Sequence, residues 1–203
     1  MVLSLRVRDL LLASWEADPE QIVRTLPPGL APAAVDGRHL VTVAALRYAG
    51  GRLGPLPVPP FSQLNVRAYV RHEGEPAVLF LLTRVTLPGM AAALLGAPYR
   101  PARLRFARGR ADAPGLGVSI AYEPSEPADP SPLTEHLLGL YEAAGLRAFR
   151  IRRGPAEWQQ ADPVAPARAD PLVALGFDVS QPPSLLYAES ARFEADLPPR
   201  RLR

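Results

Sequence analysis

The fold is decided by residues 61–70, which read Phe61-Ser62-Gln63-Leu64-Asn65-Val66-Arg67-Ala68-Tyr69-Val70. Side-chain character alternates along this stretch with a period of two, as in a half-buried β-strand. One face carries Leu64, Val66, Ala68 and Val70, and the other carries Gln63, Asn65, Arg67 and Tyr69. On an open sheet such a polar row faces water, whereas in a closed barrel it can line an internal cavity. The alternation is compatible with both arrangements.

Periodic segments on either side of this strand predict a β-rich fold. Residues 77–87 are nearly all apolar and follow a turn at 73–76, so they are expected to pair with it as a hairpin. Further strands are predicted at 10–15, 40–48, 99–107, 117–122, 147–153 and 184–194. Helices are predicted at 19–26, with Asp18 as cap, at 88–96 and at 131–144. Residues 50–60, rich in glycine and proline, are expected to form a loop. About seven strands with three short helices indicate an α+β protein with a dominant antiparallel sheet.

Length and composition place the chain among globular proteins and exclude several chemistries. The 203 residues are 48% hydrophobic and suit a single domain, 1–203. There is no cysteine, so disulfides, thiolate metal sites and a cysteine nucleophile are excluded. His39, His72 and His136 lack metal-ligand spacing, and no dinucleotide, P-loop or nucleophile-elbow motif occurs. We therefore expect no metal and no cofactor.

The charge pattern argues against nucleic-acid and membrane partners. Twenty-three basic residues, all of them arginine, nearly balance 20 acidic residues, for a net charge of +3. The basic stripe at Arg103, Arg105, Arg108 and Arg110 is interpreted as a solvated strand face, because no aromatic platform accompanies it. No signal peptide and no apolar run long enough to cross a membrane is found. A soluble, cytoplasmic protein is expected.

Two further segments carry polar or aromatic groups of interest. Trp158-Gln159-Gln160 follows a Gly-Pro turn, and a core-anchoring role for the tryptophan is favoured over ligand stacking. Pro98-Tyr99-Arg100 opens a predicted strand. It could present Tyr99 and Arg100 at a barrel mouth, although an ordinary turn explains the same residues.

Several segments together resemble the YqjF-like family, a group of uncharacterised bacterial proteins with a domain of unknown function. The core of this resemblance is Leu64-Asn65-Val66-Arg67-Ala68-Tyr69-Val70. The other matching segments, in order along the chain, are Asp18-Pro19 through Gly29-Leu30, Asp36-Gly37, Pro98-Tyr99, Pro132-Leu133-Thr134-Glu135, Trp158-Gln159 and Leu186-Tyr187-Ala188. Two positions depart from the family pattern: Gln63 replaces a usual glutamate, and Arg153 lies close to where a histidine is common.

The resemblance places the chain in the acetoacetate decarboxylase-like superfamily. It implies an antiparallel β-cone or closed barrel around an internal cavity, flanked by a few short helices. Decarboxylases of that superfamily form a Schiff base from one of two adjacent lysines after a Gly-x-Pro. Here the matching segment is Gly96-Ala97-Pro98-Tyr99-Arg100, and the chain contains no lysine. Imine chemistry by a lysine side chain is therefore impossible.

Three hypotheses of function follow. In the first, the protein binds a small molecule, with a carboxylate as one candidate, through residues Gln63, Asn65, Arg67, Tyr69, Tyr99 and Arg100. In the second, it is an enzyme performing imine-independent acid–base chemistry (proton transfer, hydration or aldol-type) on an oxo-acid, with Tyr69 or Tyr99 as the catalytic group. In the third, it is a structural or oligomerisation module whose polar row forms a homo-oligomer interface.

Overall fold

A closed seven-stranded barrel organises the protein. The computed structural model describes residues 1–86, 99–129 and 138–202. Each barrel strand pairs with the next, and the last pairs with the first. The β7–β12 pair is parallel and the others are antiparallel. In order around the ring, the strands are β1 (Val2–Glu16), β4 (Arg38–Leu53), β6 (Phe61–His72), β7 (Glu75–Val85), β12 (Leu138–Glu142), β13 (Leu146–Arg153) and β16 (Ser184–Asp196).

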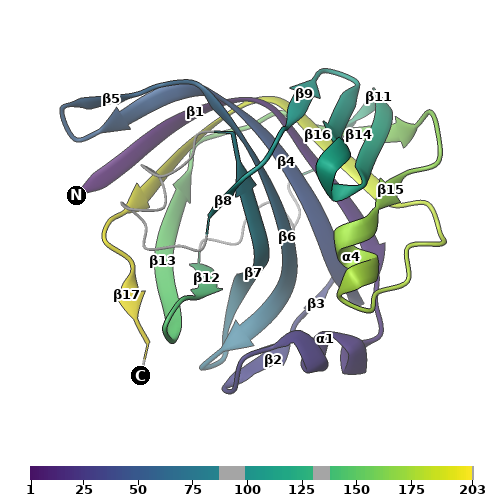
Figure 1. Cartoon of the computed structure of the whole chain (residues 1–203), viewed down its shortest axis with the longest axis horizontal. Helices are drawn as coiled ribbons and strands as arrows, with labels where there is room; N and C mark the ends of the chain where they lie inside the picture. Colours follow the sequence, from purple (N-terminus) through teal and green to yellow (C-terminus); the bar gives the residue numbers. More distant parts are fainter. Residues whose placement is uncertain (87–98, 130–137, 203) are drawn as a thin grey trace.

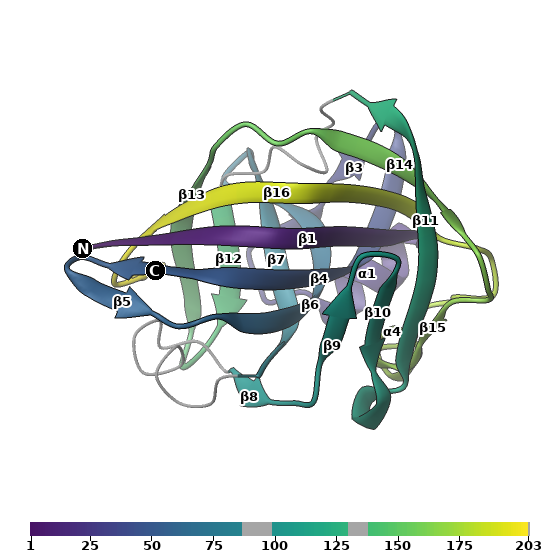
Figure 2. The same cartoon turned by 90° about the horizontal axis from the view of Figure 1, so that it is seen from above.

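The pictures show how this ring lies against the rest of the chain. In Figure 1 the barrel closes on the left through β12 and β13. On the right lie the hairpin strands β9 (Arg105–Ala107), β10 (Arg110–Ala113) and β11 (Val118–Ala128), with helices α1 (Pro19–Thr25) and α4 (Asp170–Ala174). Figure 2, which views the molecule from above, shows β16, β1 and β4 running side by side across the middle of the picture. The closed, mostly antiparallel barrel predicted from the sequence is confirmed.

Short elements complete the chain. They are β2 (Leu30–Pro32), β3 (Ala34–Val35), β5 (Leu56–Val58), β8 (Arg100–Pro101), the 3-10 helix η1 (Pro114–Leu116), β14 (Trp158–Pro163), β15 (Arg168–Ala169) and β17 (Arg200–Arg201). Helix α1 begins as predicted, because the Asp18 side chain accepts a hydrogen bond from the Glu20 backbone N–H at 2.9 Å and Pro19 follows the cap. No helix in the described part of the chain is both long and apolar enough to span a membrane.

Strand pairing determines which side chains face into the barrel. Directly opposite residues of paired strands share a face, so one face can be followed around the closed ring. Arg150, Arg152 and Arg192 are exposed and mark the outer face, whereas Leu5 and Val7 alternate with exposed residues of β1 and are buried. The row Gln63, Asn65, Arg67 and Tyr69 follows the same inner face, by way of β4.

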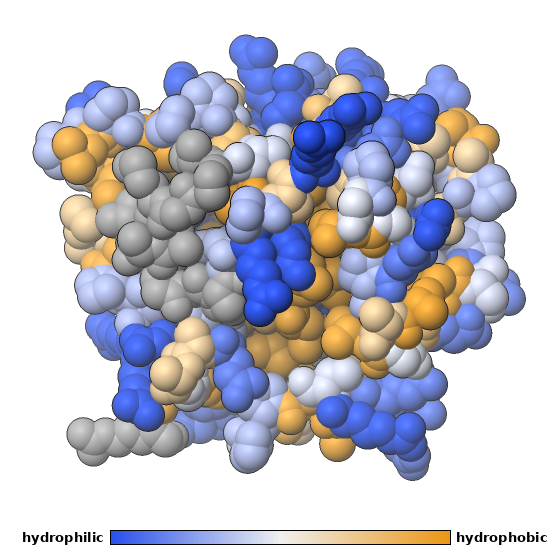
Figure 3. All heavy atoms as spheres, in the orientation of Figure 1, coloured by the Kyte–Doolittle hydropathy of each residue, from blue (hydrophilic) through white to orange (hydrophobic). Residues whose placement is uncertain are grey.

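The outer face of β6 is covered by the second layer of the structure. Leu64, Val66, Ala68 and Val70 are each 0% exposed and belong to a core that also contains α1, α4 and β9–β11 residues. Figure 3 shows hydrophobic side chains reaching the surface on this face, between β4–β6 and α4. Both faces of β6 are therefore buried. Its polar side chains face the inside of the barrel, and its apolar side chains face the core beneath α1, α4 and β9–β11.

Several predicted elements differ from the structure. Residues 138–142, predicted as part of a helix over 131–144, form strand β12 instead. Residues 131–137 of that predicted helix, and the whole predicted helix at 88–96, lie outside the described ranges. Residues 50–60 are not a loop, since β4 continues to Leu53 and pairs with β5. The predicted strand 99–107 is divided into β8 and β9, and β11 pairs with β10, which was not predicted.

Candidate functional site

The candidate site is the polar row on the inner face of β6. Gln63 is 9% exposed, Asn65 4% and Tyr69 0%, while Arg67 is half-buried. This burial lies within a single chain and argues against the hypothesis that the row forms a subunit interface. Neighbouring strands add polar groups at the same level: Thr42 of β4 lies opposite Arg67, and Thr83 of β7 lies opposite Asn65. Closure of the barrel thus brings polar residues from several strands together.

Hydrogen bonds order part of this cluster. The Gln63 Nε2 amide donates to Asn65 Oδ1 at 2.9 Å, so the two amides form a fixed pair along the strand. Ser14 and Thr42 hydroxyls lie 2.8 Å apart, and Thr42 donates to the Tyr69 hydroxyl at 3.3 Å. This chain of hydroxyls links β1, β4 and β6 across the barrel wall. It positions Tyr69 as a member of a structural network.

Arg67 places a positive charge on the inner face beside the polar row. Its Cζ lies 5.7 Å from the centroid of the Tyr69 ring, a cation–π distance. Its Nε is buried, and among the described residues it has no hydrogen-bond partner. Buried N–H donors are nearly always satisfied, and a charged donor left without an acceptor is costly. The Arg67 Nε–H could therefore donate a hydrogen bond to an acceptor on a bound ligand.

Two tyrosine hydroxyls lie within electrostatic reach of this row. Burial raises the pKa of Tyr48 far above its ordinary value, the neighbouring Tyr99 raises it further, and Arg67 opposes the shift. Burial also raises the pKa of Tyr99, Tyr141 adds to the shift, and a hydrogen bond with the Gln63 side chain opposes it. Both hydroxyls stay protonated near neutral pH. They can donate hydrogen bonds but are poor bases.

The structure places the predicted site residues in two groups. Tyr99 joins Gln63, Asn65, Arg67 and Tyr69 through the contacts above. Arg100 is exposed on β8 opposite Arg84, whose own partner on β6 is the outer-face Leu64. The structure therefore does not bring Arg100 to the row.

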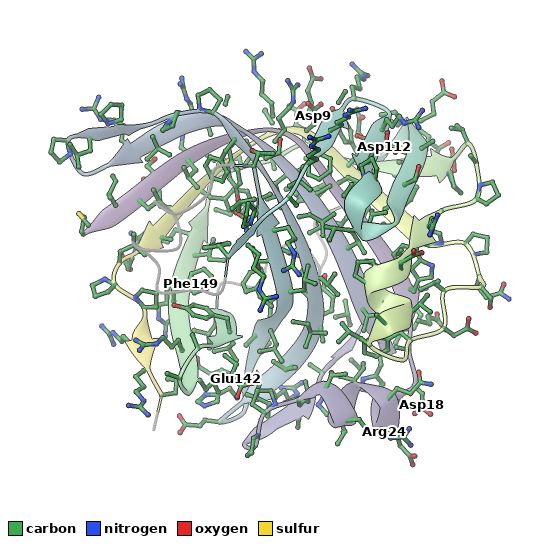
Figure 4. The ribbon with its side chains drawn as sticks, in the orientation of Figure 1. Asp9, Asp18, Arg24, Asp112, Glu142 and Phe149 are labelled. Carbon is green, nitrogen blue, oxygen red and sulfur yellow. The ribbon has the colours of Figure 1, made fainter. Side chains whose placement is uncertain are left out.

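Sequence reasoning missed three inner-face groups, Tyr48, Tyr141 and Thr42. Thr42 and Tyr48 are an even number of residues apart on the alternating strand 40–48, so the sequence pattern could have placed both on one face of that strand. Tyr141 was not identified because residues 131–144 were predicted to form a helix. In the structure it is 3% exposed on β12 and contacts Phe149, their ring centroids lying 6.0 Å apart. Figure 4 shows Phe149 on the inner side of β13, and its ring stacks on Phe80 of β7 at 5.7 Å.

Trp158 is a core residue, as predicted. It is 4% exposed and packs with Leu10 and Leu12 in the hydrophobic cluster of the inner face. The Arg153 guanidinium lies 5.4 Å from the centroid of its ring. Its indole N–H is buried without an acceptor in the described part of the chain. Within those same residues no group of three or more histidine or carboxylate side chains is arranged to hold a metal ion.

The barrel fold is shared by several proteins of known structure. The fold is similar to an acetoacetate decarboxylase-like enzyme from Sphingomonas wittichii RW1, with a TM-score of 0.71 and 15% identity over 100% of this chain and 93% of that one. It is also similar to acetoacetate decarboxylase from Legionella pneumophila subsp. pneumophila str. Philadelphia 1, with a TM-score of 0.71 and 12% identity over 100% and 88%. A third similar structure is the enduracididine biosynthesis enzyme MppR complexed with pyruvate. Its TM-score is 0.67 and its sequence identity is 15%, over 99% of this chain and 90% of that one. At these identities the likeness establishes the fold alone.

The chain belongs to the DUF2071 family, described as an uncharacterized conserved protein (COG2071), whose pattern matches residues 4–192. No curated protein matches it. The expected membership in a family of uncharacterised proteins is confirmed, and the fold is of the acetoacetate decarboxylase-like type.

Proposed function

We propose that this protein binds a small organic acid inside its barrel, with the carboxylate held by Arg67. The observation that carries this proposal is the buried Arg67 Nε, which has no acceptor among the described residues. A guanidinium presents paired N–H donors in a geometry that matches a carboxylate. An anionic ligand would supply an acceptor for this N–H, which has none within the described ranges.

The neighbouring groups suit the same ligand. Tyr48 and Tyr99 carry raised pKa values, so their hydroxyls remain neutral donors toward an oxygen-rich molecule. Gln63 and Asn65 are held in one orientation by their mutual hydrogen bond. Their remaining amide groups provide both donors and acceptors for hydroxyl or keto oxygens. Pyruvate, named as the bound molecule of one structural neighbour, is a reasonable first member of the ligand class.

The alternative function is an enzyme that uses the same inner face. The absence of lysine excludes a lysine Schiff base, which leaves proton-transfer, hydration or aldol-type chemistry on an oxo-acid. The raised pKa of Tyr99 favours a general acid over a general base, with Arg67 stabilising a developing enolate charge. Tyr69, bonded to Thr42, is the second candidate for this role. In an enzyme, Tyr99→Phe would abolish turnover while leaving ligand binding largely intact.

A thermal-shift screen tests the binding proposal. Purified protein would be heated with keto, hydroxy and dicarboxylic acids, including pyruvate and acetoacetate. A ligand at about a hundred times its Kd adds roughly 2.7 kcal/mol to the free energy of unfolding, which gives a readable increase in Tm. The proposal expects a shift for at least one acid that disappears in Arg67→Gln and persists in Arg100→Gln. An increase in Tm that persists in Arg67→Gln would contradict the proposal that Arg67 binds the ligand carboxylate.

A further inference from the structure

Four arginines gather on the outer face of three adjacent strands. Arg6 of β1 lies directly opposite Arg192 of β16, and Arg8 of β1 lies directly opposite Arg47 of β4. Arg6 and Arg8 alternate on one strand, so all four side chains share the outer face. Two cross-strand pairs of like charge therefore stand next to each other.

These arginines line one groove of about 1060 Å³. It lies where β1, β4 and β16 meet the start of β6 and the turn before β14. Figure 3 shows hydrophilic residues along this upper edge of the molecule, and Figure 4 places Asp9 there, among nitrogen-tipped side chains that project outward. No acidic residue of the described chain lines it. The lining residues besides the four arginines are Val7, Tyr48, Ala49, Pro60, Phe61, Ser62, Thr86, Gly154, Pro155, Ser190 and Ala191.

The positive charge of the groove is only partly compensated. The Asp9 carboxylate accepts hydrogen bonds from Arg47, so that guanidinium is fixed in place and neutralised. Arg6, Arg8 and Arg192 form no ion pair or hydrogen bond with the side chains that the structure describes.

Two other exposed arginines, by contrast, are paired with carboxylates. Arg152 bonds to Asp196 at 2.9 and 3.0 Å, and Arg168 bonds to Asp170 at 2.8 Å. Like charges directly opposite on paired strands are destabilising. The arginines of the groove are therefore held together at a cost in stability that a bound anion would remove.

We propose that this groove binds a phosphate-bearing small molecule of nucleotide size. Arginine forks bind phosphate oxygens in pairs, and three uncompensated guanidiniums match the charge of a di- or triphosphate. The volume lies at the upper end of the range for small-molecule pockets, about 300–1,000 Å³. Side chains of Ser62, Thr86 and Ser190 provide hydroxyls beside the charges. The four arginines lie on the opposite face of the barrel strands from Arg67, and the proposed phosphate site is centred on them.

Titration calorimetry at low ionic strength tests the proposal with ATP and inorganic tripolyphosphate as probes. Saturable binding of ATP, tripolyphosphate or both at one site per chain is expected. The comparison of the two shows whether a nucleoside adds to the recognition of phosphate. Arg6→Gln/Arg192→Gln should raise Kd by about tenfold or more, since it removes two of the three uncompensated guanidiniums. Arg8→Gln alone should weaken binding in the same direction, which guards against a folding defect of the double variant.

Matched controls separate this site from general charge effects. Arg103→Gln/Arg105→Gln removes the same charge from exposed residues outside the groove and should leave Kd unchanged, as should Arg67→Gln on the inner face. The proposal is overturned if neither probe binds, or if the groove variants bind as the native protein does. Binding of a single-stranded oligonucleotide without binding of either probe would also overturn it, and would assign the groove to nucleic acid.

Discussion

The Asp9 carboxylate binds the Arg47 guanidinium across the β1–β4 pair, with Arg47 Nε donating at 2.7 Å. Asp9 lies at an irregularity in β1, has a left-handed φ of 54° and is 6% exposed. Its second oxygen accepts a hydrogen bond from the Tyr187 hydroxyl of β16 at 2.8 Å. One buried carboxylate therefore joins three neighbouring barrel strands at the point where the regular ladder of β1 is interrupted.

Asp9→Asn should lower the free energy of unfolding by about 1–3 kcal/mol, because charge-assisted hydrogen bonds to Arg47 are replaced by weaker neutral ones. Asp36→Asn is the matched control. Asp36 also has a positive φ, 50°, but it is exposed in a turn, so the free energy of unfolding should hardly change. Urea denaturation measures both variants. Equal effects at the two positions would show that the backbone conformation, and not the Arg47 contact, is responsible.

Alkaline pH should destabilise the protein through Tyr122. Burial raises the pKa of this hydroxyl to about 12, the Asp9 carboxylate adds to the shift, and a backbone hydrogen bond to Gly109 opposes it. The unfolded chain ionises tyrosine near pH 10. The stability linked to this group is therefore complete below about pH 10 and is lost as pH rises through about 12.

Thermal melting between about pH 9 and 12 measures this dependence. The native protein should lose stability more steeply across the range than Tyr122→Phe, which has no hydroxyl to ionise. Superimposable pH profiles for the two proteins would contradict the assignment to Tyr122.

Gly139→Ala should destabilise the barrel at the β12–β13 seam. A Cβ at Gly139 would lie 2.6 Å from Phe149 Cζ, so the ring would have to leave its stacking contact with Phe80. Overpacking of this kind costs about 1–3 kcal/mol. Gly115→Ala is the control, because nothing lies within 4 Å of the added carbon there. Denaturant unfolding should show a loss for Gly139→Ala alone, and near-ultraviolet circular dichroism should report a changed environment of Phe149.

The barrel was predictable from sequence to the extent that its strands alternate. The row on 61–70 predicted a strand with two different faces, and the structure gives both faces a buried role. Alternation by itself cannot say which face lies inside, because the pattern is the same for either choice. The family resemblance indicated that the polar face lies inside the barrel, and the closed ring of strand pairs bears this out.

Elements that depend on distant partners were harder to predict. Leu138, Leu140 and Tyr141 fit an apolar helix stripe as well as a strand, and pairing with β7 and β13 selects the strand. The extension of β4 to Leu53 was missed because glycines and prolines indicate loops. Pro57 is tolerated in β5 because, among the described residues, that short strand pairs only with β4. Arg100 looked equivalent to Tyr99 in sequence, yet the two lie in different surroundings.

The central claim is that Arg67 holds a carboxylate inside the barrel. Calorimetric titration of the acid that gives the largest thermal shift tests it most directly, using Arg67→Gln and Arg71→Gln. Both variants lose one positive charge from β6, but Arg71 is exposed and bonds to the Gly74 carbonyl at 3.2 Å. Arg67→Gln should raise Kd by about tenfold or more, whereas Arg71→Gln should leave it unchanged. An unchanged Kd in Arg67→Gln, or a panel in which no acid binds, would contradict it.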